Sequence, residues 1–330
     1  MAYDSKVLRR AAARYDEDKQ RREAQFRALQ RTCYDREPRL QEIDRELSHT
    51  MAKIIASGLR RGTDPRSAIE SLKEENLALQ QERGELLVRL GYPADALEPK
   101  PACEACNDSG WVGSSMCDCL RRYYVREQNA ELSRMLDLGT QSFDTFDIQY
   151  YSPTETFGRK TTARENMDHN RDTCYGFARY FPSSLKNLLL SGDPGLGKTF
   201  LSACVAREVS GRGYSVVYDT AAHIFQRFEA QKFRRDEDAD EAEDDVSRYL
   251  RCDLLIIDDL GTEMTTSFVQ SALYQIINSR LIAQRSTIIS TNLNPLQIGE
   301  RYGEAILSRI RGEYEFLPFF GDDIRKLKKK

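Results

Sequence analysis

The stretch SGDPGLGKTF, residues 191–200, places three glycines, a lysine and a threonine directly after the apolar run NLLL at 187–190. Residues 192–199 satisfy the pattern G-x-x-x-x-G-K-[ST] between an expected strand and an expected helix, which is the context that this pattern requires. Glycines allow backbone N–H groups to converge on phosphate oxygens, and the helix N-terminus adds positive potential there. The stretch therefore predicts a phosphate-binding loop, with a chance glycine-rich turn as the alternative.

The segments around this loop alternate between short apolar strands and helices. Besides NLLL, strands are expected at 214–220, 252–260 and 286–292, with amphipathic helices between them. Buried strands that alternate with helices specify a parallel sheet covered on both faces. The predicted fold class is an α/β P-loop domain with such a sheet, preceded by a helical N-terminal region and a small metal module.

Two side chains of the loop have predicted contacts with a nucleotide. The Lys198 ammonium is expected to reach the β- and γ-phosphates, and the Thr199 hydroxyl is expected to coordinate Mg²⁺. The bound nucleotide is then ATP or ADP. The predicted nucleotide-binding residues of the loop are Gly192, Asp193, Pro194, Gly195, Leu196, Gly197, Lys198, Thr199 and Phe200.

Paired carboxylates end the apolar strand in LLIIDDLG, residues 254–261. Asp258 is expected to hold Mg²⁺ through water, and Asp259 to orient or deprotonate the attacking water; a helix-capping or supporting carboxylate is the alternative for Asp259. Asn292 ends the strand STIISTN, where its amide could contact the γ-phosphate or the water. A plain turn residue is the alternative for Asn292.

Cysteines cluster in PACEACNDSGWVGSSMCDCLR, residues 101–121. Cys103, Cys106, Cys117 and Cys119 form the spacing C-x₂-C-x₁₀-C-x-C, and two close pairs of thiolates suit a tetrahedral Zn²⁺. Four protein ligands leave no open position, so the zinc would be structural. Ordinary thiols and an iron–sulfur cluster are the alternatives.

Composition narrows the class of protein. The 330 residues carry 49 Lys or Arg against 52 Asp or Glu, so any basic surface for nucleic acid must be local. No apolar run is long enough for a secretory signal or for the roughly 20 residues of a membrane span. We therefore expect a soluble cytoplasmic protein without membrane contact. The expected parts are a helical partner-docking region at 1–100, the zinc module at 101–121, a linker at 122–165 and the ATPase domain at 166–330. For the helical region, a hairpin or short coiled coil with a solvated charged face is the alternative, and periodicity alone does not indicate docking.

From about residue 100 to 327 the chain resembles AAA+ ATPases of the DnaC/DnaI replicative helicase-loader type. The resemblance lies in SGDPGLGKTFLSACVARE, LLIIDDLGTE, STNL, ILSRIRGEYEFLPFFGDDIRK and the preceding cysteine block. It implies a Mg²⁺-dependent ATPase that delivers a hexameric replicative DNA helicase onto single-stranded DNA in replication initiation. It also implies a homo-oligomer, spiral when ATP is bound.

The resemblance also implies roles for two arginines. Arg309, in LSRI, matches the arginine finger that completes the ATP site of the next subunit, and Arg325, in GDDIRK, matches the sensor-2 arginine. Surface arginines without a role are the alternative for both. Contact with single-stranded DNA is expected from an aromatic flanked by arginines and from residues after the carboxylate strand, namely Phe233, Arg234, Arg235, Thr266 and Phe268.

Other interpretations stay open. Phe233 could be a core residue, with Arg234 and Arg235 paired to the acidic run that follows them. An IstB-like transposition helper ATPase has nearly the same core, although the cysteine block argues against it. A P-loop small-molecule kinase is a third interpretation, disfavoured by the lack of an evident arginine-rich lid and by the paired carboxylates with Asn292.

Overall fold

The computed structural model describes residues 3–58, 66–136, 140–183, 187–233 and 246–327; the side chains of 50–73 and of residue 233 lie outside this description. The chain divides into two compact units. One unit is Arg14–Cys117, and the other combines Met1–Ala13 with Asp118–Lys330. Among the described residues, no helix is both long enough and apolar enough to cross a membrane.

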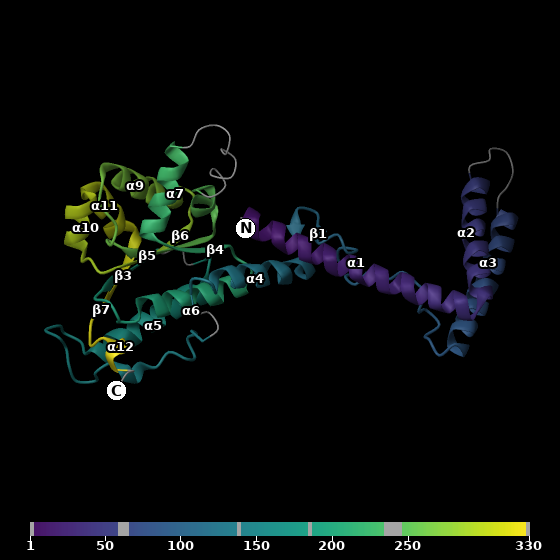
Figure 1. Ribbon diagram of the computed structural model, residues 1–330, viewed down its shortest axis with the longest axis horizontal. Helices are drawn as coiled ribbons and strands as arrows, with labels where there is room; N and C mark the ends of the chain where they lie inside the picture. The colour runs from purple at the N-terminus through teal and green to yellow at the C-terminus, as the bar shows by residue number, and fades with distance from the viewer. Residues whose placement is uncertain (1–2, 59–65, 137–139, 184–186, 234–245, 328–330) are drawn as a thin grey trace. The chain divides into compact units, whose positions relative to one another are not determined.

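The second unit is built on a five-stranded parallel sheet with the order β4-β5-β6-β3-β7 (Figure 1). The predicted parallel sheet is therefore confirmed. Because β6 lies between β3 and β5, the residue after β6 stands between the loop after β3 and the carboxyl end of β5. The strands are β3 (Asn187–Gly192), β4 (Val216–Thr220), β5 (Leu254–Leu260), β6 (Ser286–Thr291) and β7 (Tyr314–Phe319).

Helices cover both faces of the sheet (Figure 1). Successive strand residues alternate between two cores: Leu188 and Leu190 belong to one hydrophobic cluster, and Leu189 to the other. The first cluster packs under α4 (Asp118–Leu132), α5 (Ala163–Tyr180) and α6 (Lys198–Gly211). The second packs under α7 (Ala221–Phe233), α9 (Ser267–Ile282), α10 (Pro295–Tyr302) and α11 (Glu304–Glu313).

Strand β7 and helix α4 of this unit were not predicted. The edge strand β7 contains Pro318, which weakens the strand pattern, but an edge strand tolerates the missing N–H. Helix α4 begins the stretch expected to be a linker. Its Leu120, Tyr124, Gln128 and Leu132 recur every four residues and are buried, a helical spacing that the sequence did contain.

The start of the chain packs on this same unit. Asp4 donates its backbone N–H to the hydroxyl of Tyr124 at 2.9 Å, and its carboxylate pairs with the Arg248 guanidinium at 2.7 Å. Val7 is buried, and the ring of Tyr3 meets Tyr124 edge-on with centroids 5.3 Å apart. These contacts place residues 3–13 in the unit of the sheet although they begin the long helix α1 (Ser5–Arg36).

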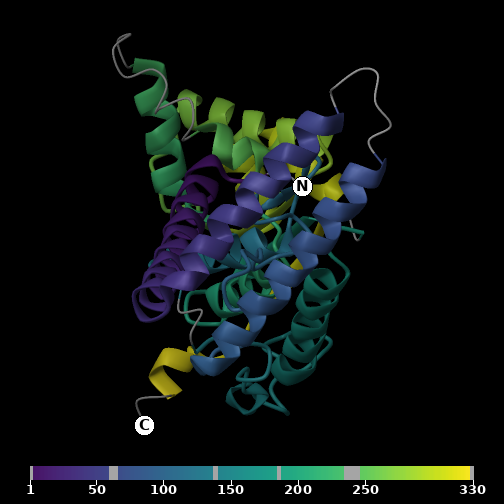
Figure 2. The ribbon, with the colours of Figure 1, turned by 90° about the vertical axis from the view of Figure 1, so that its right-hand side faces the viewer.

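The unit Arg14–Cys117 is helical, as expected for the charged N-terminal region. Helices α2 (Pro38–Gly58) and α3 (Arg66–Arg89) pack along each other (Figure 2). A small two-stranded sheet of β1 (Trp111–Val112) and β2 (Ser115–Met116) follows. The core of the helical part consists of Cys33, Leu40, Ile43, Leu79, Leu86, Leu87 and Leu97.

A buried arginine ties the sheet to its helices. The Arg280 side chain has no exposed surface, and its guanidinium donates to the carbonyls of Tyr249 (2.7 Å), Cys252 (3.1 Å) and Ser286 (2.6 Å) and to the Thr287 hydroxyl (2.9 Å). It thereby donates hydrogen bonds to buried carbonyl groups near the starts of β5 and β6.

Replacing this arginine is predicted to destabilise the fold. Arg280→Met keeps much of the side-chain volume but leaves several buried carbonyls unsatisfied, each worth about 1–3 kcal/mol, so we expect a loss of at least about 3 kcal/mol in denaturant unfolding. Arg285→Met is the control, because Arg285 makes a partly exposed ion pair with Asp253 at 3.5 Å, and it should cost less than about 1 kcal/mol. Equal losses in the two variants would contradict this assignment.

Candidate functional site

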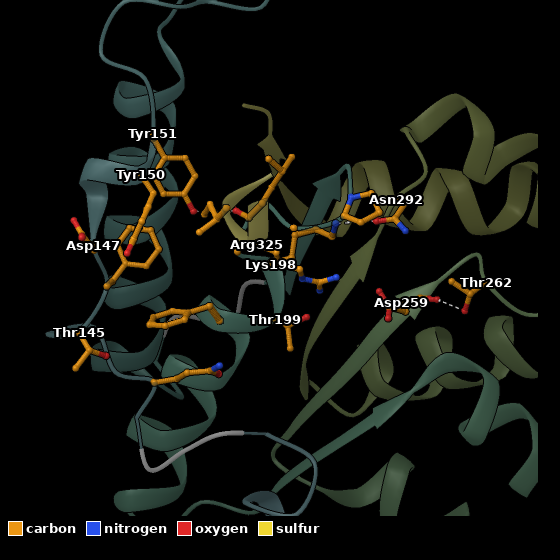
Figure 3. A pocket seen from close by; sticks show the side chains of 18 residues that line it. Thr145, Asp147, Tyr150, Tyr151, Lys198, Thr199, Asp259, Thr262, Asn292 and Arg325 are labelled. Atoms are coloured by element: carbon orange, nitrogen blue, oxygen red, sulfur yellow. Dashed lines mark hydrogen bonds between the residues drawn. The ribbon is translucent and has the colours of Figure 1, made fainter. Parts of the chain in front are cut away.

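A cavity of about 690 Å³ opens beyond the carboxyl ends of β3, β5 and β6 (Figure 3). Figure 3 shows that Lys198, Thr199 and Arg325 lie between two walls, one with Asp259 and Asn292 and the other with Tyr150 and Tyr151. The cavity is lined by Gln141, Thr145, Phe146, Asp147, Tyr150, Tyr151, residues 194–200, Asp259, Thr262, Asn292, Ile324 and Arg325.

The loop between β3 and α6 takes a conformation that needs glycine. Gly195 and Gly197 have φ values of 82° and 93°, in the left-handed region that favours glycine. A Cβ on Gly195 would also lie 2.0 Å from the Asp323 Oδ1 atom. Gly197 directly precedes the first residue of α6, so the loop ends at a helix N-terminus, as predicted.

Lys198 holds this loop together in the structure. Its Nζ donates to the carbonyls of Gly192 (2.5 Å) and Asp193 (2.9 Å) and to Asn292 Oδ1 (2.8 Å). Burial lowers the pKa of the Lys198 ammonium, while the carboxylates of Asp259 and Asp258 act in the opposite direction. The lysine and the asparagine predicted from separate motifs are therefore in direct contact.

Asp258 lies buried at the end of β5 and accepts three hydroxyl hydrogen bonds. The Thr199 hydroxyl donates to Oδ2 at 3.2 Å, and the hydroxyls of Tyr218 and Ser290 donate to Oδ2 and Oδ1. Carboxylate and hydroxyl oxygens are the ligands that Mg²⁺ accepts, so the Asp258–Thr199 pair fits this cation. The sequence analysis missed Tyr218 and Ser290, whose only signal was their position one strand away on either side of β5.

Asp259 has an unusual backbone. Its φ of 53° is a left-handed value in a residue other than glycine, and its N–H donates to Ser290 Oγ at 3.1 Å. Such strain often accompanies a functional position. The side chain is exposed and lines the cavity, and desolvation together with the Asp258 charge raises the pKa of its carboxyl group. The two neighbouring carboxylates thus have different surroundings, one buried and bonded and the other open to the cavity.

Of the two arginines with predicted roles, one lines the cavity and the other does not. Arg325, in α12 (Ile324–Leu327), lines the cavity with Lys198. Arg309 is exposed on α11 and does not line it. Within the described ranges, the Arg309 side chain makes no hydrogen bond or ion pair.

One wall of the cavity was not predicted. Phe146 meets Phe200 edge-on with centroids 5.6 Å apart and stacks on Tyr151 at 5.9 Å. This wall comes from residues 141–151, including the single turn η1 (Ile148–Tyr150). The signal in the sequence was the density of aromatics in FDTFDIQYY, which we interpreted as a linker that packs on its neighbours.

Of the residues expected to contact DNA, Thr266 and Phe268 make contacts within the protein. The Thr266 hydroxyl caps α9 by accepting from the N–H of Val269. Phe268 is half-buried, with Lys232 Nζ 5.2 Å from its ring centroid. Arg234 and Arg235 lie outside the described residues, as does the side chain of Phe233.

The predicted cysteine cluster is formed. The four Sγ atoms of Cys103, Cys106, Cys117 and Cys119 lie within 4.8 Å of one another, and those of Cys103 and Cys117 are 3.7 Å apart. Zn–S bonds of about 2.3 Å in a tetrahedron put sulfurs about 3.8 Å apart, so the cluster fits this metal. Asp108 supports the first pair by accepting from the N–H groups of Ala102 and Cys103, both at 3.0 Å.

The sheet order, together with a phosphate loop after β3, defines a P-loop domain of the AAA+ class. Residues 178–330, slightly less than half of the chain, match the model of the IstB-like ATP binding protein family. The resemblance inferred from the motifs is thereby confirmed for the ATP-binding domain.

The curated relatives include a named helicase loader and an uncharacterized protein. The chain is 29% identical over 136 residues to the replicative helicase loader DnaC of Escherichia coli strain K12, a match that covers 41% of this chain and 54% of DnaC. It is 30% identical over 124 residues to the uncharacterized protein YdaV of the same strain, covering 38% of this chain and 48% of YdaV. The chain thus spans about half the length of the curated relatives it matches.

Matches among solved structures include a DnaC helicase loader and DnaI. The DnaC structure has a TM-score of 0.45 and 21% identity, covering 56% of this chain and 99% of that one. The DnaI structure has a TM-score of 0.44 and 18% identity, covering 57% and 92%.

The cysteine cluster predicts a bound metal. Purified protein should contain about one zinc per chain by elemental analysis, and Cys117→Ser should lower that content because it removes one of four thiolates. Cys174→Ala is the matched control, since this cysteine is buried in the core away from the cluster. Protein prepared without chelator that carries no zinc would contradict the prediction, and iron with sulfide would support the cluster alternative.

Proposed function

We propose that this protein is an ATP-dependent loader that delivers a hexameric replicative DNA helicase onto single-stranded DNA. The observation that carries the proposal is the convergence of Lys198, Asn292 and Asp259 on one cavity, in an ATP-binding domain whose curated relatives include DnaC helicase loaders. The cysteine module and the helical region before it, residues 1–100, would dock on the helicase. Residues 122–165, which include most of α4 and the aromatic wall of the cavity, would connect that docking region to the rest of the ATP-binding domain.

The cavity suits ATP hydrolysis. The N–H groups of residues 195–199 and the Lys198 ammonium would hold the phosphates, with Lys198 exchanging its loop carbonyls for phosphate oxygens. Thr199 and Asp258 would hold Mg²⁺, which neutralises charge on the β- and γ-phosphates. Asp259, open to the cavity, would orient or deprotonate the attacking water. Asn292 would contact the γ-phosphate or that water.

Two arginines would complete the charge balance from different subunits. Arg325 lies at the cavity of its own chain and would act there. Arg309 is exposed and away from that cavity, which suits a finger inserted into the site of a neighbouring copy. Such an exchange requires the homo-oligomer, which would be a spiral in the ATP-bound state.

Contact with single-stranded DNA would involve residues at the end of α7 and at the start of α9. Phe233, Arg234 and Arg235 remain candidates because an aromatic with arginines can stack a base and neutralise phosphates. Thr266 and Phe268 would have to contact DNA while keeping their roles in capping and packing α9. The proposed site of action is the cytoplasm.

Loss of the loop lysine is predicted to abolish nucleotide binding or turnover. Lys198→Ala removes the only side-chain cation of the loop, so ATP hydrolysis should fall to background in a phosphate-release assay. Arg309→Ala is the contrasting variant: it should keep ATP binding and lose turnover in the assembled state. Undiminished hydrolysis in Lys198→Ala would remove the central assignment.

The loader role is tested by assembly with the helicase. Mixed with the replicative helicase of its host, the protein should form a complex whose size changes with ATP in a sizing experiment, and Lys198→Ala should lose that dependence. The same experiment is repeated with a transposase from the same host, because an IstB-like transposition helper is the second candidate function. Assembly with the transposase and not with the helicase would favour that alternative.

A further inference from the structure

Two peptide carbonyls of the phosphate loop are held by groups that lie outside the loop. The Tyr151 hydroxyl donates to the Leu196 carbonyl at 3.0 Å, and the Ile324 N–H donates to the Gly195 carbonyl at 3.0 Å. In a trans peptide the carbonyl and the following N–H point in opposite directions. Holding these carbonyls therefore fixes the directions of the next N–H groups, which belong to Leu196 and Gly197.

Tyr151 is itself held firmly. Its side chain is 2% exposed, and its ring stacks on Phe146. Its N–H donates to the Ile148 carbonyl at 3.1 Å, and its carbonyl accepts from Arg164 Nε at 3.0 Å. The hydroxyl is thus presented to the loop by a side chain with little freedom of its own.

The loop sequence is matched to this hydroxyl. A Cβ on Gly197 would lie 2.7 Å from the Tyr151 oxygen, closer than such contacts allow. Gly197 is therefore required twice, by its φ of 93° and by the approach of the tyrosine. Tyr151 stands 46 residues before Gly197 and belongs to none of the motifs from which the site was predicted.

We propose that Tyr151 is a positioning residue that keeps the phosphate loop in its binding conformation. This inference rests on the proposed function, since it assumes that the loop binds the phosphates of ATP. Without the hydroxyl the Leu196 carbonyl would lose a buried partner, and the loop would spend part of its time with the Gly197 N–H turned elsewhere. A binding-competent state that is less populated weakens the apparent affinity by the same factor.

The test uses Tyr151→Phe, which keeps the ring and its packing and removes only the hydroxyl. The full chain is titrated with ATP and with inorganic tripolyphosphate, which contacts the loop without a base or sugar. One buried hydrogen bond predicts a dissociation constant about three- to tenfold higher for both probes. In steady-state turnover, KM should rise by a similar factor while kcat changes less than about twofold.

Two variants separate positioning from general damage. Tyr124→Phe removes another buried tyrosine hydroxyl of the same unit, one that accepts from the Asp4 N–H, and should leave both dissociation constants unchanged. Phe146→Leu removes the ring that stacks on Tyr151 but keeps the hydroxyl, so it should raise the dissociation constants of both probes, and by less than Tyr151→Phe raises that of tripolyphosphate. A variant that merely unfolds would lower the active fraction, and with it kcat, at constant KM.

The outcomes distinguish the two proposals. If the unmodified protein binds ATP and tripolyphosphate but Tyr151→Phe binds both equally well, the positioning role is overturned and the ATPase proposal stands. An equal loss in Tyr124→Phe would also overturn it, because the effect would then be one of stability. If the unmodified protein binds neither probe, both proposals fail together.

Discussion

The contact between the Lys198 ammonium and the Asn292 side chain depends on the order of the strands more than on either residue. At 2.8 Å it joins the loop after β3 to the end of β6, and it forms because β6 is inserted between β3 and β5. The same position of β6 places Ser290 next to Asp258. The strand order therefore brings the lysine, the amide and the carboxylates together. A sheet with β3 directly beside β5 would remove Asn292 from its place between the lysine and the carboxylates.

Burial of charge at this edge of the sheet is compensated locally. Asp258 is 3% exposed, and a carboxylate removed from water is costly unless it is hydrogen-bonded. Three hydroxyls serve that need, from Thr199 on the loop side, Tyr218 on β4 and Ser290 on β6. Asp259, one residue later, turns away from the sheet through its left-handed backbone and faces the cavity. Adjacent residues of the same type can therefore take different tasks.

Sequence reasoning succeeded where the signal is local. The phosphate loop, the apolar strands and the cysteine pairs each carry their pattern within about 20 residues, and the parallel sheet and the cysteine cluster were predicted from them. It failed where a contact joins distant segments: Tyr218 is 40 residues from Asp258, and Tyr151 is 45 from Leu196. The edge strand β7 was missed because Pro318 interrupts its pattern, and only pairing with β3 makes it a strand.

The packing of residues 3–13 on the sheet unit matters for anyone who dissects this chain with truncations. A fragment cut near residue 118 or 166 to isolate the ATP-binding part would strip Asp4 from Arg248, and the cut near 118 would also leave the Tyr124 ring without Tyr3. Cutting at 166 would also delete Tyr151 and the aromatic wall of the cavity. If such a fragment folded poorly, the cause would be the loss of residues that belong to its own fold. In the intact chain those residues include 3–13, far from the sheet in sequence.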